Sequence, residues 1–219
     1  MIKKNIKFSI AIDGSGASGK TTGSKIISKK FKFKLLSSGK LYRYLAFKII
    51  KNNKKYDQKY IRNQSKKITL LKLKNKKLNN PQVTKLSSII ATKKYIRNEL
   101  KKVQINFIKK NNQVIIEGRD IASKIMPNAD LKIFFRCSLK EKAKRRLKEY
   151  KKINKNIKLR DVKKSLKLRD FSDKNRKESP LLFVKGAVLV DTTKLTMEQM
   201  KLRLVNLVKK KLIKKYGNI

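Results

Sequence analysis

The sequence predicts an α/β protein with a five-stranded parallel sheet covered by helices on both faces, in three layers. Its apolar runs are short and continuous, which is typical of strands buried on both sides. Helical patterns separate these runs, as expected where crossover helices join parallel strands. A chain of 219 residues can bury the core of one such domain. The expected strands are residues 6–12, 32–38, 113–117, 130–137 and 187–190.

The first expected helix follows a glycine loop and ends at residue 30. Further helices are expected at 39–51, at 86–109 in two pieces, and at 138–152, 158–173 and 196–215. The segment Asn52–Lys85 differs, because it is rich in Lys and Asn and breaks at Asn79-Asn80-Pro81. It contains one β-like run, Lys67–Leu73. We therefore expect an insertion with a small sheet outside the main core.

The glycine loop after the first strand carries the clearest chemistry. Residues 14–21 read GSGASGKT and match G-x-x-x-x-G-K-[ST], between an expected strand and an expected helix. Glycines allow the backbone N–H groups to surround an anion, and the positive end of the following helix faces the same place. Lys20 can reach the β- and γ-phosphates, and the Thr21 hydroxyl can ligate Mg²⁺. The sequence therefore predicts a nucleoside triphosphate site of the P-loop type.

The net charge is +48, from 62 Lys and Arg against 14 Asp and Glu. The basic residues are spread along the whole chain, which favours a compositional bias typical of an AT-rich genome over a dedicated binding surface. Loose association with RNA or the ribosome is the alternative. In either case the charge attracts anionic substrates and makes their binding sensitive to salt.

The reactive residue types narrow the possible chemistry. The sequence has no His, which excludes a His general base, a Ser-His-Asp triad and His-bound zinc. The single Cys, Cys137, lies in an apolar run and is expected to be buried in a reducing compartment. We find neither a signal peptide nor an apolar run of about 18 residues, and expect a soluble, cytoplasmic protein.

Arginines stand out in a chain whose usual base is lysine, because a guanidinium group binds phosphate as a planar fork. Arg119 follows a buried strand, at the end where α/β sheets bind ligands. Arg169 and Arg176 flank a pair of aspartates. Arg43 lies near the start of an expected helix, and Arg97 lies within another.

Several stretches in order resemble the bacterial cytidylate kinases, which are P-loop nucleoside-monophosphate kinases. These stretches are IAIDGSGASGKTT, LLSSGKLYRYLA, VTKLSSIIATKKYIRNEL, IIEGRDIASKIMPNADLKIFF with AKRR after it, RDFSDKNRKESPL and VLVDTTKLTMEQM. The resemblance covers nearly the whole chain. It implies a P-loop NTPase fold with a core of 1–51, 86–150 and 177–219, a small monophosphate-binding insert at about 52–85 and a lid at about 151–176.

The resemblance also implies roles for single residues. The ATP phosphates would be held by Gly14, Ser15, Gly16, Ala17, Ser18, Gly19, Lys20, Thr21 and Thr22, with Mg²⁺ on Thr21. The catalytic residues would be Lys20, Arg119, Arg169 and Arg176. The acceptor monophosphate would contact Ser38, Tyr42 and Arg43. The cytosine would contact Ser88, Arg97 and Asp120. The phosphates and the ribose would contact Arg119, Arg169, Asp173 and Arg176.

The implied reaction is ATP-dependent phosphorylation of CMP or dCMP to the diphosphate, by a monomer without a specific nucleic-acid partner or a membrane partner. An acceptor phosphate is already ionised, so the reaction needs no general base and tolerates the lack of His. The chain departs from the family pattern at Ser37, where an Asp is usual, and at Lys40, Ala122-Ser123 and Lys174. Two alternatives stay open: another P-loop kinase, and a basic RNA-binding P-loop protein without catalysis.

Overall fold

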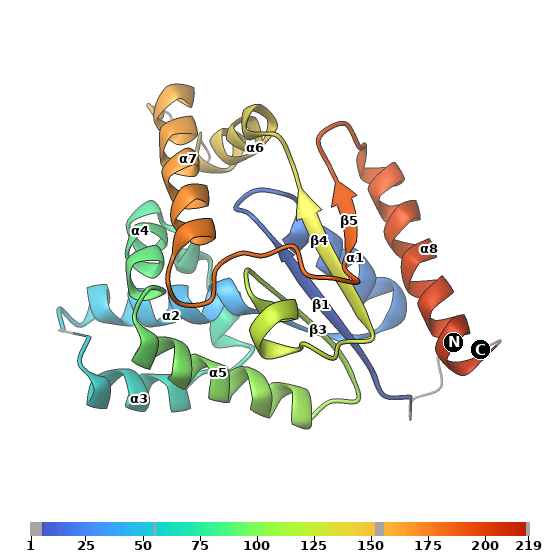
Figure 1. Cartoon of the computed structure of the whole chain (residues 1–219). Coiled ribbons are helices and arrows are strands. Elements are labelled where there is room, and N and C mark those ends of the chain that lie inside the picture. The colour runs from blue at the N-terminus through green and yellow to red at the C-terminus, as the bar shows by residue number, and fades with distance from the viewer. Residues whose placement is uncertain (1–5, 55, 152–155, 218–219) are drawn as a thin grey trace. The chain divides into compact units, whose positions relative to one another are not determined.

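The computed structural model describes residues 6–54, 56–151 and 156–217 (Figure 1). The chain divides into two compact units. The sheet unit consists of residues 1–35 and 111–219, and the helical unit of residues 36–110.

The sheet unit begins with β1 (Phe8–Gly14), α1 (Lys20–Phe31) and the first half of β2 (Lys34–Ser37). It resumes with β3 (Gln113–Gly118), the short turn η3 (Ile121–Ile125), β4 (Leu131–Arg136), α6 (Leu139–Lys151), α7 (Leu159–Asn175), β5 (Val188–Asp191) and α8 (Met197–Tyr216). The helical unit contains α2 (Ser38–Lys51), α3 (Gln58–Lys66), η1 (Lys72–Lys74), η2 (Lys76–Asn79), α4 (Pro81–Ile90) and α5 (Lys94–Lys109).

The five strands form one sheet in the order β2-β3-β1-β4-β5, which confirms the predicted five-stranded parallel sheet. β1 lies in the middle and pairs in parallel with β3 and β4. Ile12 lies opposite Glu117 on one side and Ile133 on the other. The carboxyl ends of the central strands therefore lie at one edge of the sheet, where open α/β sheets bind ligands.

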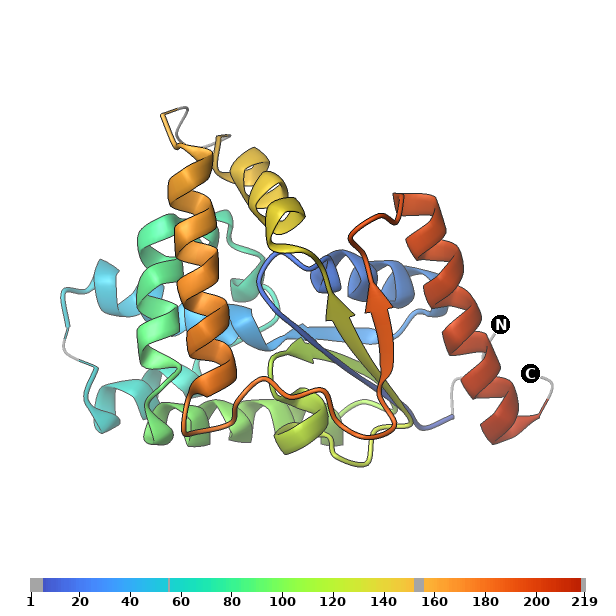
Figure 2. The same cartoon turned by 45° about the horizontal axis from the view of Figure 1, so that its top comes forward.

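One face of this sheet packs against α1 and α8, which also contact each other (Figures 1 and 2). α8 places an apolar residue on the sheet at every fourth position, as in Leu204 and Val208, and both are fully buried. Its start is fixed by a capping box in which Thr196 and Gln199 bond each other's backbone N–H groups. The expected helix over 196–215 is confirmed.

The predicted strand Lys67–Leu73 is wrong, and the described part of 52–85 contains helices and turns instead of a small sheet. Local bonds satisfy the backbone there: the Thr69 hydroxyl accepts from the Lys72 N–H, and the Lys72 ammonium donates to the Lys67 carbonyl. Leu70 and Leu71 are exposed, so the apolar run has no sheet to cover.

The break predicted at Asn79-Asn80-Pro81 is the start of α4. The Asn80 side chain accepts from the Gln82 N–H at 2.8 Å, and Pro81 occupies the first turn, where its missing N–H costs nothing. The predicted lid contains α7, while its residues 152–155 lie outside the described part. None of the helices in the described ranges is both long and apolar enough to cross a bilayer.

Candidate active site

The loop between β1 and α1 has the backbone of an anion site. Gly14 and Gly19 have φ values of 152° and 87°, which side chains disfavour. A Cβ on Gly14 would lie 2.5 Å from the Phe135 carbonyl oxygen, so no larger residue fits there. No side chain in the described ranges caps α1, which starts directly after Gly19. The first N–H groups of the helix are therefore available to a bound anion.

Lys20 lies at the start of α1 and is buried, with its Nζ 3.1 Å from the Ser15 carbonyl oxygen. Burial, assisted by the positive charge of Arg119, lowers the pKa of Lys20 to about 7. The charge of Glu117 opposes this shift, and further negative charge in the loop would stabilise the cationic form of Lys20. The loop is thus prepared for an anionic ligand.

Thr21 follows Lys20 and donates its hydroxyl to the carboxylate of Glu117, 2.8 and 2.9 Å from its two oxygens. Glu117 is the second-last residue of β3 and is almost fully buried. A hydroxyl and a carboxylate side by side are the oxygen ligands that Mg²⁺ prefers, and Mg²⁺ commonly takes few protein ligands. The residues fit this ion, although the described residues contain no group of three or more His, Cys, Asp or Glu suited to a metal.

Asp13 is the second-last residue of β1, and its carboxylate accepts two backbone hydrogen bonds, from the N–H groups of Ile121 at 2.9 Å and Ala122 at 2.7 Å. It thereby fixes the turn that carries Arg119 and Asp120. Burial raises the pKa of Asp13 to about 6, although these two bonds oppose the shift. Because Asp13 binds backbone N–H groups, the departure at Ala122 leaves the contact intact.

Three arginines surround one carboxylate in the sheet unit. Asp173 accepts from Arg119 at 2.8 Å and from Arg176 at 3.4 Å, and Arg169 lies 4.0 Å away. Burial alone would raise the pKa of Asp173, but the charges of the arginines outweigh it and hold that pKa below its usual range. With three arginines around one aspartate, the cluster keeps an excess of positive charge. It adjoins the loop, because a Cβ on Gly16 would lie 3.7 Å from Arg119 Nη2.

Lys142 and Asp170 are two residues that sequence reasoning missed. Lys142 of α6 is buried, forms an ion pair with Asp170 of α7, and donates to the Ser15 hydroxyl at 3.2 Å. α6 and α7 pack against each other (Figures 1 and 2), and the pair with its Ser15 contact ties both helices to the phosphate loop. No local pattern distinguishes Lys142 from the many other lysines.

A second brace holds the loop at Ser18 and Gly19. The hydroxyl of Thr192, just after β5, donates to the Ser18 carbonyl at 2.9 Å. Arg145 of α6 donates to the Thr192 carbonyl at 2.7 Å and to its hydroxyl at 3.0 Å. An ordinary Cβ on Gly19 would contact both partners. α6 therefore holds the loop from two positions, Lys142 and Arg145.

The helical unit contains the other predicted site residues, Ser38, Tyr42, Arg43, Ser88 and Arg97. It brings Tyr42 and Arg97 together, with the guanidinium 5.9 Å from the centre of the ring, and both are buried. Arg97 also donates to the Ala91 carbonyl at 3.1 Å, and Ser88 to that of Thr84. Arg43 donates to the Asn79 side chain at 2.9 Å. Ser38 is buried at the start of α2.

Free backbone N–H groups and guanidinium groups at the carboxyl edge of a parallel sheet suit a polyphosphate, and the motif around them is that of the P-loop nucleotide-binding proteins. A sequence model of the family described as cytidylate kinase matches residues 10–210. The cytidylate kinase of Fusobacterium nucleatum is 37% identical over 221 residues, covering 94% of this chain and 97% of that protein. The cytidylate kinase of Rickettsia rickettsii is 38% identical over 206 residues, covering 94% and 93%.

The chain belongs to the cytidylate kinase family. It is therefore a kinase that uses ATP. Among solved structures, an uncharacterized protein from Eubacterium ventriosum aligns with a TM-score of 0.53 over 93% of this chain and 99% of its own. A protein from Thermus thermophilus aligns with a TM-score of 0.51 over 94% and 98%. Both are 12% identical and show the fold alone.

Proposed function

We propose that this kinase transfers the γ-phosphoryl group of ATP to CMP or dCMP, giving ADP and CDP or dCDP. The observation that carries the proposal is the family match over residues 10–210, which contains the phosphate loop and every predicted substrate residue. The named relatives are cytidylate kinases and are covered almost completely.

The chemistry of the sheet unit supports this transfer. Phosphoryl transfer depends on positioning and on stabilising charge that spreads over the transferred group. Lys20 and the first N–H groups of α1 would bind the ATP phosphates. Arg119, Arg169 and Arg176, oriented by Asp173, would bind the phosphates between which the group moves. The CMP phosphate is itself the nucleophile, so no side chain has to remove a proton from it.

Mg²⁺ is part of the proposal. It would be held at the Thr21 hydroxyl, with Glu117 beside it, and when bound it supplies charge neutralisation between phosphate oxygens. The structure supports this role because Thr21 and Glu117 are hydrogen-bonded to each other. Glu117→Gln should therefore raise the Mg²⁺ concentration needed for half-maximal rate.

The remaining proposed roles concern the acceptor phosphate and its base. We propose that Arg43, Tyr42 and Ser38 bind the acceptor monophosphate and that Ser88, Arg97 and Asp120 select cytosine. Residues of about 52–85 would form the monophosphate-binding insert and about 151–176 the lid. The protein would act as a cytoplasmic monomer, which size-exclusion chromatography and cell fractionation would test.

The decisive experiment measures ADP release from Mg-ATP with a panel of nucleoside monophosphates at two salt concentrations. We expect rapid turnover with CMP and dCMP, and little with AMP or GMP. Lys20→Ala should abolish transfer, because the phosphates lose their buried amine. Lys25→Ala, which removes an exposed lysine from the same helix, is the matched control and should leave turnover unchanged.

Two results would contradict the proposal. Faster turnover with AMP or GMP than with CMP would show that the cytosine assignment is wrong. Absence of turnover with every monophosphate, while ATP still binds, would favour a P-loop protein without monophosphate kinase activity.

A further inference from the structure

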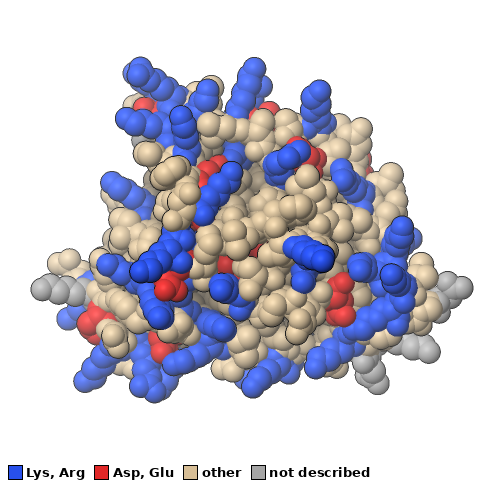
Figure 3. All heavy atoms as spheres, in the orientation of Figure 1, with Lys and Arg blue, Asp and Glu red and all other residues tan. Residues whose placement is uncertain are grey.

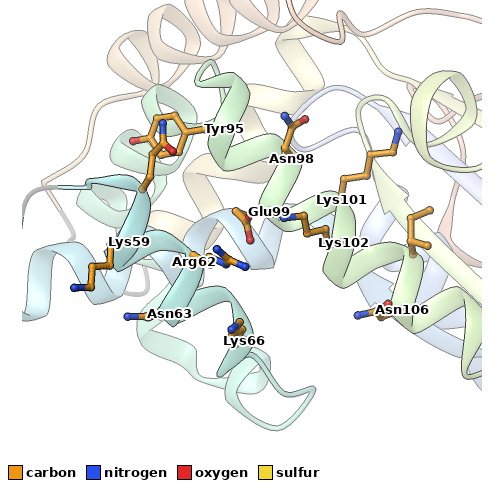
Figure 4. A pocket seen from close by; sticks show the side chains of 12 residues that line it. Lys59, Arg62, Asn63, Lys66, Tyr95, Asn98, Glu99, Lys101, Lys102 and Asn106 are labelled. Carbon is orange, nitrogen blue, oxygen red and sulfur yellow. Dashed lines mark hydrogen bonds and ion pairs between the residues drawn. The ribbon is translucent and has the colours of Figure 1, made fainter.

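A groove of about 930 Å³ lies between α3 and α5 of the helical unit (Figure 4). Twelve side chains line it, from Gln58 to Lys66 on α3 and from Tyr95 to Asn106 on α5. It lies apart from the predicted acceptor residues, since Arg97 of α5 is buried against Tyr42 of α2. Neither the phosphate loop nor the arginine cluster uses any of these residues.

The groove is strongly basic. Its cationic side chains are Lys59, Arg62, Lys66, Lys101 and Lys102. Its one acidic residue, Glu99, is paired with Lys102 at 2.6 Å. The side chains of Lys59, Arg62, Lys66 and Lys101 form no hydrogen bond or ion pair with any residue in the described ranges. A concave surface lined by charges of one sign concentrates the field within it and attracts anions.

The spacing of these residues follows the two helices. On α3 the basic residues are separated by three and four positions, at 59, 62 and 66, which places them along one face. On α5 the lining residues run from 95 to 106, a length of about 17 Å at 1.5 Å per residue. Figure 4 shows Arg62 of α3 and Lys102 of α5 directed into the space between the helices. The arrangement fits a linear anion with repeated charges.

Carboxamides complete the lining, from Gln58, Asn63, Asn98 and Asn106. They both donate and accept hydrogen bonds, so they match base edges and ribose hydroxyls as well as phosphates. Tyr95 adds an aromatic ring held in place by a hydrogen bond from its hydroxyl to the Tyr56 carbonyl. Cations, carboxamides and an aromatic ring together are the components of a single-strand nucleic-acid groove.

We propose that the groove between α3 and α5 binds single-stranded RNA, with its cations on the phosphates and its carboxamides on the ribose hydroxyls. Its mostly exposed lining suits an extended strand better than a compact nucleotide, which buried donors would have to enclose. The recess between two helices also fits a strand better than a flat lipid surface. Basic side chains cover much of the visible molecular surface (Figure 3), so the test must separate the groove from general charge.

The test compares two variants that lose the same charge. The groove variant is Lys59→Gln/Lys66→Gln/Lys101→Gln, and the control is Lys209→Gln/Lys210→Gln/Lys214→Gln on the exposed side of α8. Gln and Lys have similar helix propensities, so both variants should fold. Fluorescence anisotropy measures the binding of a labelled oligouridylate of about 12 nucleotides, at several salt concentrations.

We expect the groove variant to bind at least tenfold more weakly than the control. Its slope of log K against log salt should fall by about 2, from three lost contacts at about 0.7 each for a single strand. The binding assay contains neither CMP nor ATP, so its result does not depend on turnover and this proposal can fail separately from the proposed function. Cross-linking of the unmodified protein to the oligouridylate should label peptides from residues 58–66 and 95–106.

Equal losses in the two variants, or cross-links outside these peptides, would overturn the proposal and leave only non-specific charge. Binding of single-stranded DNA or inorganic polyphosphate as tightly as RNA would overturn the assignment to RNA.

Discussion

The ion pair between Lys142 and Asp170 allows a quantitative prediction. The exposed fractions of the two side chains are 6% and 16%. Within the described residues, Asp170 Oδ1 has no hydrogen-bond partner and Oδ2 has only Lys142. Lys142→Met would therefore leave a largely buried carboxylate without its counter-charge. Breaking such a pair costs about 3–5 kcal/mol, and the partial exposure of Asp170 places the expected loss near 3 kcal/mol.

The assay is unfolding by urea and by heat at neutral pH. For a chain of this size about 3 kcal/mol corresponds to a fall in Tm of about 6–12 °C. Lys140→Met is the matched control, because it removes an exposed lysine from the same helix and should change stability by less than about 0.5 kcal/mol. Lys142→Met/Asp170→Leu should recover most of the loss, since an apolar pair removes the uncompensated charge.

The reasoning would be refuted if Lys142→Met cost no more than Lys140→Met. It would also fail if the double variant were less stable than Lys142→Met, because the penalty would then not arise from the isolated carboxylate.

Three other predictions follow from the sheet unit. Gly23→Ala should lower the Tm, because its Cβ would lie 2.6 Å from the buried ring of Phe135, and overpacking of about 1–3 kcal/mol exceeds a helix-propensity gain of about 1 kcal/mol. NMR of the Asp13 carboxyl should show titration near pH 6. Because the folded pKa is raised, the contribution of Asp13 to the free energy of unfolding is full below about pH 4 and is lost as the pH rises through 6. Asp173→Asn should lower kcat at least tenfold in the ADP-release assay by releasing Arg119, with thermal unfolding as the check on folding.

Local signals explain why the sequence predicted most of the fold. The phosphate loop, the strand before it and the helix after it are adjacent in the chain, so the 25 residues from 6 to 30 contain the whole pattern. The predicted strand Lys67–Leu73 is wrong although its apolar pattern is present, because no strand in the described residues pairs with it. Whether such a run joins a sheet depends on distant segments, and here Leu73 alone of its leucines is buried.

The candidate site shows the same limit. Glu117 had a signal that was not used, because an acidic residue at the end of a buried strand lies at the ligand edge of a parallel sheet. Lys142 and Thr192 had none. Their partners lie far along the chain, at Asp170 and Ser18, and only the fold brings them together. The roles of the predicted acceptor residues in the helical unit stay predictions.

The central position of β1 has a consequence for synthesis on the ribosome. The first strand to emerge pairs with β3, where Phe8 lies opposite Gln113, and with β4, which comes later still. At about 5–20 residues per second, the roughly 100 intervening residues take about 5–20 s to be made. The helical unit, residues 36–110, is complete in the chain before any partner of β1 exists. The central strand of the core is thus exposed longest in the nascent protein, and chaperones would have most to protect during that interval.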